Sequence, residues 1–67
     1  MVVEVMVEGL VYTIKPDPTR RNWFYSVMQN PFKDYHDTEV IYGGSYEIVE
    51  RKLNRQYIKF KGENINE

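Results

Sequence analysis

The stretch 22–28 (Asn-Trp-Phe-Tyr-Ser-Val-Met) limits the possible folds of this chain more strongly than any other segment, because it is apolar on both faces. Side chains along a strand point alternately to opposite faces. Its large side chains fall into two sets, Trp23, Tyr25 and Val27 on one face and Phe24 and Met28 on the other. Such a strand belongs in a sheet covered on both sides, or in a sheet whose second face binds a partner. The sequence leaves these two alternatives open.

The length of the chain limits the core that it can build. Its 67 residues make one domain, and a chain of this size buries only about 60% of the surface that its unfolded form exposes. With no cysteine and one histidine, the chain is expected to use neither disulfides nor a structural metal. We expect a single globular domain over residues 1–61 and a polar tail over residues 62–67. A homodimer formed through the valine-rich segment 2–7 is an open alternative.

The charge and the aromatic content favour protein contact over purely electrostatic binding. Ten acidic and nine basic residues give a net charge of −1, whereas nucleic-acid binders usually carry a basic excess. One tryptophan, six tyrosines and three phenylalanines supply both core volume and contact surface. No segment approaches the ~20 apolar residues of a membrane span, and the acidic N-terminal segment does not resemble a signal peptide. We therefore expect a cytoplasmic protein that does not contact membranes.

Residues 2–15 are predicted to form a β-hairpin. Two sets of three apolar residues share one face of this segment, Val3, Val5 and Val7 before Gly9 and Leu10, Tyr12 and Ile14 after it. Glycine tolerates a positive φ, so Gly9 marks either a tight turn or a bulge, and the turn is favoured. Pro16 and Pro18 end the second strand, because proline cannot donate to the ladder. Residues 22–28 and 38–42 are predicted as the next two strands.

Residues 45–55 are ambiguous, and a helix is favoured. Ser45 is a good N-cap, and one helical stripe contains Tyr46, Val49, Leu53 and Tyr57. The competing interpretation is a hairpin with its turn at Asn54-Arg55. Residues 56–61 are predicted as an edge strand with Ile58 and Phe60 facing inward. The expected fold is an α+β domain, a small antiparallel sheet of four to five strands with one helix on a face, and the alternative is an all-β small barrel.

No residue pattern in this chain predicts catalysis, a cofactor or a bound metal. The densest titratable cluster, Asp34-Tyr35-His36-Asp37, is interpreted as a solvated loop, since one histidine falls short of any zinc pattern. Gly43-Gly44-Ser45 lacks the lysine of a phosphate-binding loop and is interpreted as a helix entry. A domain this small is also expected to have little room for a pocket of the usual ~300–1,000 Å³. The chain is therefore predicted not to be an enzyme.

The favoured function is that of a small regulatory module that binds a protein and modulates or inhibits a larger assembly. Tyrosine, tryptophan and arginine are enriched in interface hot spots, and these residue types cluster around the central strand and its two loops. For any single one of these aromatic residues, a core role is favoured over a contact role, because large aromatic side chains dominate core as well as interface energetics. The predicted partner-binding residues are Arg20, Arg21, Trp23, Tyr25, Phe32, Tyr35 and Tyr42.

The alternative function is nucleic-acid binding. The segment 21–27, the following strand and the Gly43-Gly44-Ser45 entry to a helix loosely resemble the sheet-plus-helix arm-binding domains of tyrosine-type integrases. That resemblance implies sheet-mediated binding in the DNA major groove. This chain departs from the family at its third strand, which contains Glu39 where a basic strand is expected. The residues assigned to this alternative are Arg20, Arg21, Arg51, Lys52, Arg55, Lys59 and Lys61.

Overall fold

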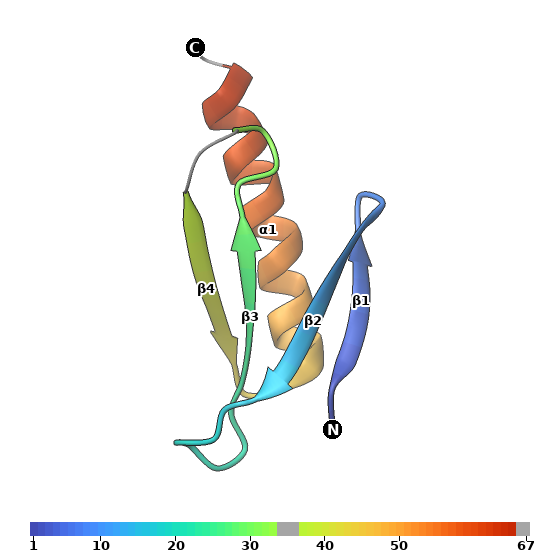
Figure 1. Ribbon diagram of the computed structural model, residues 1–67, viewed down its shortest axis with the longest axis vertical. Helices are drawn as coiled ribbons and strands as arrows, with labels where there is room; N and C mark the ends of the chain where they lie inside the picture. The colour runs from blue at the N-terminus through green and yellow to red at the C-terminus, as the bar shows by residue number, and fades with distance from the viewer. Residues whose placement is uncertain (34–36, 66–67) are drawn as a thin grey trace.

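The computed structural model describes residues 1–33 and 37–65 as an open antiparallel sheet with one helix against a single face (Figure 1). The strand order follows the chain. The elements are β1 (Val3–Val7), β2 (Leu10–Pro16), β3 (Phe24–Gln29), β4 (Thr38–Gly43) and α1 (Tyr46–Ile65). The predicted α+β fold with four to five strands is confirmed. The barrel alternative is wrong, because β1 and β4 form the two open edges of the sheet.

A two-residue turn joins β1 to β2, as the sequence predicted. Glu8 and Gly9 both have positive φ, at 50° and 81°, and Val7 pairs with Leu10 across the turn. Positive φ at both central positions is the type I′ geometry, whose twist matches that of the flanking strands. Val7 and Ile14 from this hairpin are then buried against the helix side of the sheet.

The start of α1 confirms the predicted helix and its cap. The Ser45 hydroxyl accepts a hydrogen bond from the Ile48 N–H at 3.2 Å, and the Ser45 carbonyl accepts one from the Val49 N–H at 3.2 Å. These contacts satisfy backbone donors that a helix start otherwise leaves unpaired. The Asn54 side-chain amide donates to the Glu50 carbonyl within the helix, so the alternative hairpin with its turn at Asn54-Arg55 is wrong.

The predicted edge strand over residues 56–61 is wrong, because α1 continues through this segment to Ile65. Phe60 lies three residues after Tyr57 and extends the buried stripe of the helix, with 2% of its surface exposed. Ile58, which the strand interpretation placed inside, is 68% exposed. The helix also enters the stretch 62–67 that the composition predicted as a tail.

The core lies between α1 and one face of the sheet, and the helix contacts all four strands. The strands contribute Val7, Ile14, Met28 and Ile41, and the helix contributes Val49, Leu53 and Phe60. On β3, Met28 and Ser26 are buried on this side, whereas Val27 is exposed on the other. The predicted alternation of β3 is therefore confirmed. Trp23 precedes the strand instead of belonging to it.

Gly43 lets the helix approach β4 closely. A Cβ atom at this position would lie 2.7 Å from Ile48 Cγ2 and 3.0 Å from Val49 Cγ2. Both neighbours are β-branched side chains fixed on the first turn of α1, so they have little freedom to move away. The short segment Gly44-Ser45 between β4 and α1 fixes this approach.

We expect Gly43→Ala to lower the free energy of unfolding by about 1–3 kcal/mol, because the added methyl group overpacks the contact between β4 and α1. Gly62→Ala is the matched control, since a Cβ there meets nothing within 4 Å and helical alanine is favoured by up to ~1 kcal/mol over glycine. Urea unfolding followed by circular dichroism measures both. Equal effects of the two substitutions would contradict the close approach.

Candidate functional site

The face of the sheet turned away from α1 is apolar and uncovered. Five of its large side chains are exposed, namely Met6 (65%), Val11 (58%), Val27 (47%), Val40 (45%) and Tyr42 (45%). The strand register places them next to one another, with Met6 opposite Val11, Val27 opposite Val40 and Tyr25 opposite Tyr42. We call this surface, formed by these five residues and Tyr25, the open face. It occupies all four strands in two sets, Met6 and Val11 on β1–β2 and the other four residues on β3–β4, and each set is contiguous across its strand pair.

Two tyrosines and a loop shape one end of the open face. The rings of Tyr25 and Tyr42 lie 6.4 Å apart, and a shallow hollow of about 330 Å³ lies between them and the loop 17–19. Asp17 holds that loop, since its carboxylate accepts hydrogen bonds from the Thr19 hydroxyl at 2.7 Å and the Thr19 N–H at 2.9 Å. These bonds, and then the nearby Arg20, lower the pKa of Asp17. Because the pKa of Asp17 is lower in the folded protein than in the unfolded chain, the ionised carboxylate stabilises the fold above its unfolded pKa. This stabilisation is lost as the pH falls through the pKa of Asp17 in the folded protein.

The loop before β3 brings two of the predicted partner-binding residues together. The Arg20 guanidinium lies 4.3 Å from the centre of the Trp23 ring, a cation–π geometry. Trp23 is half-buried, and Gly44 lies beneath its ring. Its buried indole nitrogen has no hydrogen-bond partner among the residues that the structure describes. Trp23 therefore anchors the loop and offers Arg20 a platform, while Arg21 is exposed beside it.

The other predicted partner-binding residues do not join one surface. Tyr25 and Tyr42 lie on the open face, whereas Phe32 packs its ring 5.2 Å from that of Tyr57 on α1 and so supports the fold. Tyr35 lies outside the described residues. The prediction thus combined residues from the open face, the loop before β3 and the opposite end of the molecule.

The basic residues of the nucleic-acid alternative are separated in the same way. Arg51, Arg55 and Lys59 are exposed on α1, which covers the other face of the sheet. The Lys52 ammonium donates to the Tyr42 carbonyl at 2.9 Å, at the edge of β4. Lys59 and Lys61 lie on the helix rather than on the predicted last strand. None of these basic residues of α1 lies on the open face.

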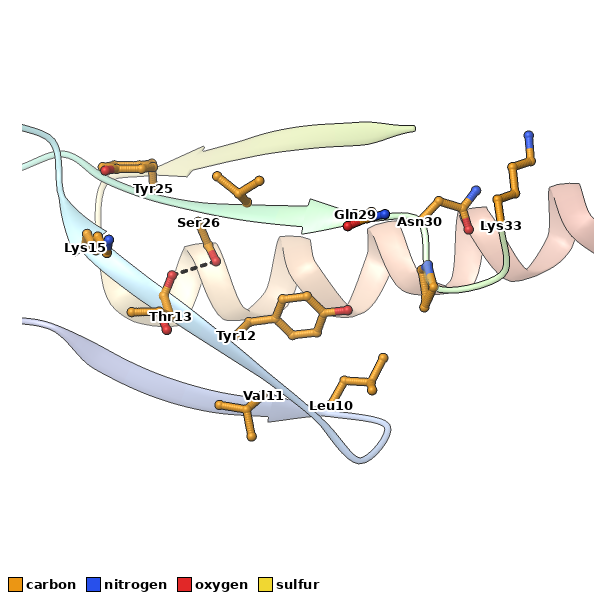
Figure 2. Close-up of a pocket in the computed structure, with 12 residues that line it drawn as sticks. Leu10, Val11, Tyr12, Thr13, Lys15, Tyr25, Ser26, Gln29, Asn30 and Lys33 are labelled. Carbon is orange, nitrogen blue, oxygen red and sulfur yellow. Dashed lines mark hydrogen bonds between the residues drawn. The ribbon is translucent and has the colours of Figure 1, made fainter. Parts of the chain in front are cut away.

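A gap separates β2 from β3 over most of their length. The two strands pair only at Lys15↔Tyr25 and Pro16↔Phe24, and then diverge (Figure 1). Just beyond the last pair, the buried Ser26 hydroxyl donates to the Thr13 carbonyl at 2.7 Å (Figure 2). A side-chain hydrogen bond therefore stands where the backbone ladder would otherwise continue.

The gap opens into a groove of about 660 Å³, so the expectation that this domain lacks room for such a hollow is wrong. Figure 2 shows Tyr12 extending into it from β2, and Asn30 and Lys33 at its far end. Burial, and then the neighbouring Tyr57, raises the pKa of Tyr12. None of the twelve lining residues is an aspartate, glutamate, histidine or cysteine. What the groove offers is apolar surface, hydroxyl groups and backbone.

The titratable cluster at 34–37 falls mostly outside the described residues. Asp37 is described, and its carboxylate accepts a hydrogen bond from the Asn30 side-chain amide at 3.0 Å and lies 3.8 Å from the Lys33 ammonium. Asp37 thus helps to close the loop after β3. Within residues 1–33 and 37–65, no three histidine, cysteine, aspartate or glutamate side chains are grouped so that they could hold a metal ion.

Sequence reasoning missed most of the open face and all of the groove. A signal for the open face was present, since Met6 and Val11 alternate with the residues of the hairpin that were expected to share one face. The groove left no comparable signal. It depends on where two strands stop pairing, and strand alternation is the same on either side of that point.

We expect Ser26→Ala to lower the free energy of unfolding by about 1–2 kcal/mol, because it leaves the Thr13 carbonyl without its partner. Thr13→Val is the matched control, since it changes the side chain of the acceptor residue and keeps the carbonyl and Ser26 in place. That control is expected to change stability by no more than ~0.5 kcal/mol. Equal losses in the two variants, measured by urea unfolding, would contradict a structural role for the hydroxyl.

The comparisons with known proteins leave the open face and the groove as the basis for assigning a function. No helix within the described ranges is both long and apolar enough to cross a lipid bilayer. No protein-family model, no curated protein and no solved structure matches this chain.

Proposed function

We propose that this protein is a small, non-catalytic cytoplasmic module that binds another protein through the open face and so modulates or blocks a larger assembly. The observation that carries the proposal is the exposure of apolar side chains on all four strands of one face. These side chains are contiguous within the β1–β2 pair and within the β3–β4 pair, and contiguous apolar surface is typical of interaction sites. The absence of cysteine fits a reducing compartment.

The charge of the open face supports a protein partner. The strand register puts only Glu4 and Lys15 among its apolar residues, beside Thr13 and Tyr25 respectively. Interface centres are depleted of charge and enriched in tyrosine. The neighbouring rings of Tyr25 and Tyr42, tilted by 39°, and the hollow beside them supply an aromatic anchor and a cavity at one end of this surface. The rim at that end carries Arg20 and Arg21, whose charges would affect the association rate more than the affinity.

We expect the double variant Val27→Lys/Val40→Glu to lose the partner while keeping its fold. Val27 and Val40 lie directly opposite each other, so the new charges form a favourable cross-strand pair that keeps the sheet paired. The same charges introduce a polar, hydrated patch at the centre of the open face, where we expect a loss of at least about tenfold in affinity. Affinity capture from an extract of the source cell, followed by titration with the purified partner, measures the loss.

Ile58→Lys is the matched control, because Ile58 is 68% exposed on the helix, on the other side of the molecule. We expect this variant to capture the same partner with unchanged affinity. Capture that is reduced equally in both variants, or unchanged in the double variant, would contradict binding through the open face. Light scattering on the purified protein also tests the homodimer alternative, in which the partner is a second copy of the chain.

Nucleic-acid binding is the second candidate, and the exposed Arg51, Arg55 and Lys59 on α1 favour it. If it is correct, affinity for a generic duplex falls linearly on logarithmic axes between about 50 mM and 200 mM salt. The variant Arg51→Glu/Arg55→Glu should then abolish binding, whereas Val27→Lys/Val40→Glu should leave it unchanged. Absence of retention on the duplex and on a single strand at low salt would exclude this candidate.

A further inference from the structure

We propose that the gap between β2 and β3 is a binding site for an extended segment of the protein partner, which enters the sheet there as an added strand. The inference rests on the proposed function in one respect, that the segment belongs to a protein. Such strand addition provides affinity through backbone hydrogen bonds and specificity through alternate side chains.

The backbone geometry around the gap carries the inference. Lys15 pairs with Tyr25, and two residues further on the Asp17 N–H donates to the Trp23 carbonyl at 2.8 Å. In an antiparallel ladder, alternate residues direct their peptide groups toward the same neighbour. The peptide groups that the two strands direct into the gap are therefore those of Val11 and Thr13 on β2 and of Val27 and Gln29 on β3. Backbone pairing between these two sets is absent from the described register, and the Ser26 hydroxyl occupies one acceptor, the Thr13 carbonyl.

The size of the groove suits a short strand. The part of β2 beyond the hydrogen bond between Thr13 and Ser26 runs from Leu10 to Tyr12, which corresponds to about 10 Å of extended chain at ~3.3 Å per residue. The groove volume of about 660 Å³ lies within the range of peptide and small-molecule sites. Leu10, Val27 and Pro31 line it with apolar surface, and Tyr12 lies within it (Figure 2). About three residues of an extended chain, at ~3.3 Å each, would contact both strands.

The outer edges of the sheet are less suited to strand addition than the gap. Tyr42 on β4 directs its carbonyl outward, and the Lys52 ammonium already donates to it at 2.9 Å. At the other edge, β1 directs the peptide groups of Glu4 and Met6 outward, and the charged side chain of Glu4 weighs against pairing there. Lysines and capped carbonyls at edges discourage further pairing. The gap instead presents two strands facing each other.

The charge of the groove defines the chemistry of the segment. Lys15 stands at the closed end, where β2 and β3 still pair, and no carboxylate is among the lining residues. Lys33, at the far end, already lies 3.8 Å from Asp37. The site therefore fits a segment of alternating apolar residues with an acidic residue at the end beside Lys15. Lys15→Glu should then reverse this preference in favour of a basic residue.

A phage-displayed library of random linear peptides selected on the whole protein tests the inference. The selected peptides should be acidic at one end, and Lys15→Glu should select basic ones. Amide hydrogen exchange then locates the bound peptide on the protein. The amides of Val11, Val27 and Gln29 should gain protection, whereas those of Ser26 and Met28, which face β4, should change little. Protection gained only at Thr38, Val40 or Tyr42 would place the peptide on the outer edge of β4 and overturn the inference.

A matched pair of proline variants makes the test specific for the gap. Gln29→Pro removes an N–H directed toward β2, and Thr38→Pro, at the residue opposite, removes one directed to the outer edge of β4. We expect Gln29→Pro to weaken peptide binding about five- to tenfold and Thr38→Pro to leave it unchanged, with circular dichroism confirming that both are folded. The reverse order of effects would overturn the inference.

The same measurements separate this inference from the proposed function. If the protein captures a partner that Val27→Lys/Val40→Glu loses, while that partner leaves exchange at Val11 and Gln29 unchanged, the binding module stands and the inserted strand is rejected. If no partner depends on the open face and no peptide is selected, both are rejected. A selected peptide whose binding is abolished by N-methylation at alternate and at intervening residues alike supports pairing with both β2 and β3, whereas tolerance at every second residue would mean pairing with a single strand and overturn the inference.

Discussion

The packing of a single helix on a single face of the sheet is the constraint on which the rest of this structure depends. A chain of 67 residues has enough apolar side chains for one layer of core, and α1 supplies Val49, Leu53 and Phe60 to it. Gly43 allows the first turn of the helix to lie directly against β4, and Ser45 caps that turn. The helix direction is therefore fixed immediately after the last strand.

One-sided packing explains why the second face of the sheet remains apolar and exposed. Residues that alternate with the buried ones, such as Val27 between Ser26 and Met28, point away from the helix. The chain has no second helix or sheet to place over them within its described residues. The two alternatives posed by an apolar strand, covered on both faces or exposed for a partner, are thus decided in favour of the exposed face.

The divergence of β2 from β3 follows from the same arrangement. One helix must contact all four strands, and sheets twist, so the β1–β2 hairpin turns with the twist and leaves β3 beyond Lys15 (Figure 1). Ser26 satisfies the first carbonyl that this separation leaves without a backbone partner. The groove is therefore a consequence of how the hairpin packs. Residues of β2, β3 and the loop after β3 line it, and their side chains alone do not indicate it.

The candidate site was predictable only in part. Tyr25 and Tyr42 were assigned to contact from their residue type, and the structure places them together on the open face. Phe32 was assigned for the same reason, but it packs against Tyr57. An aromatic side chain serves core and contact surface equally well, so residue type cannot separate the two roles. The aliphatic residues Met6, Val11 and Val40 were overlooked because single exposed aliphatic residues are ordinary, and only their adjacency across strands is informative.

The sequence by itself determined the local structure, from the type I′ hairpin at Glu8-Gly9 to the capped helix at Ser45, because φ preference, capping and side-chain period act over a few residues. It failed at residues 56–61, where Ile58 and Phe60 fit a strand and Tyr57 and Phe60 fit a helix equally well. Tertiary packing decided that segment, since only the helix buries Phe60 in the existing core. The open face and the gap between β2 and β3 were likewise decided by the tertiary structure, because both depend on which residues remain without neighbours after one helix has packed.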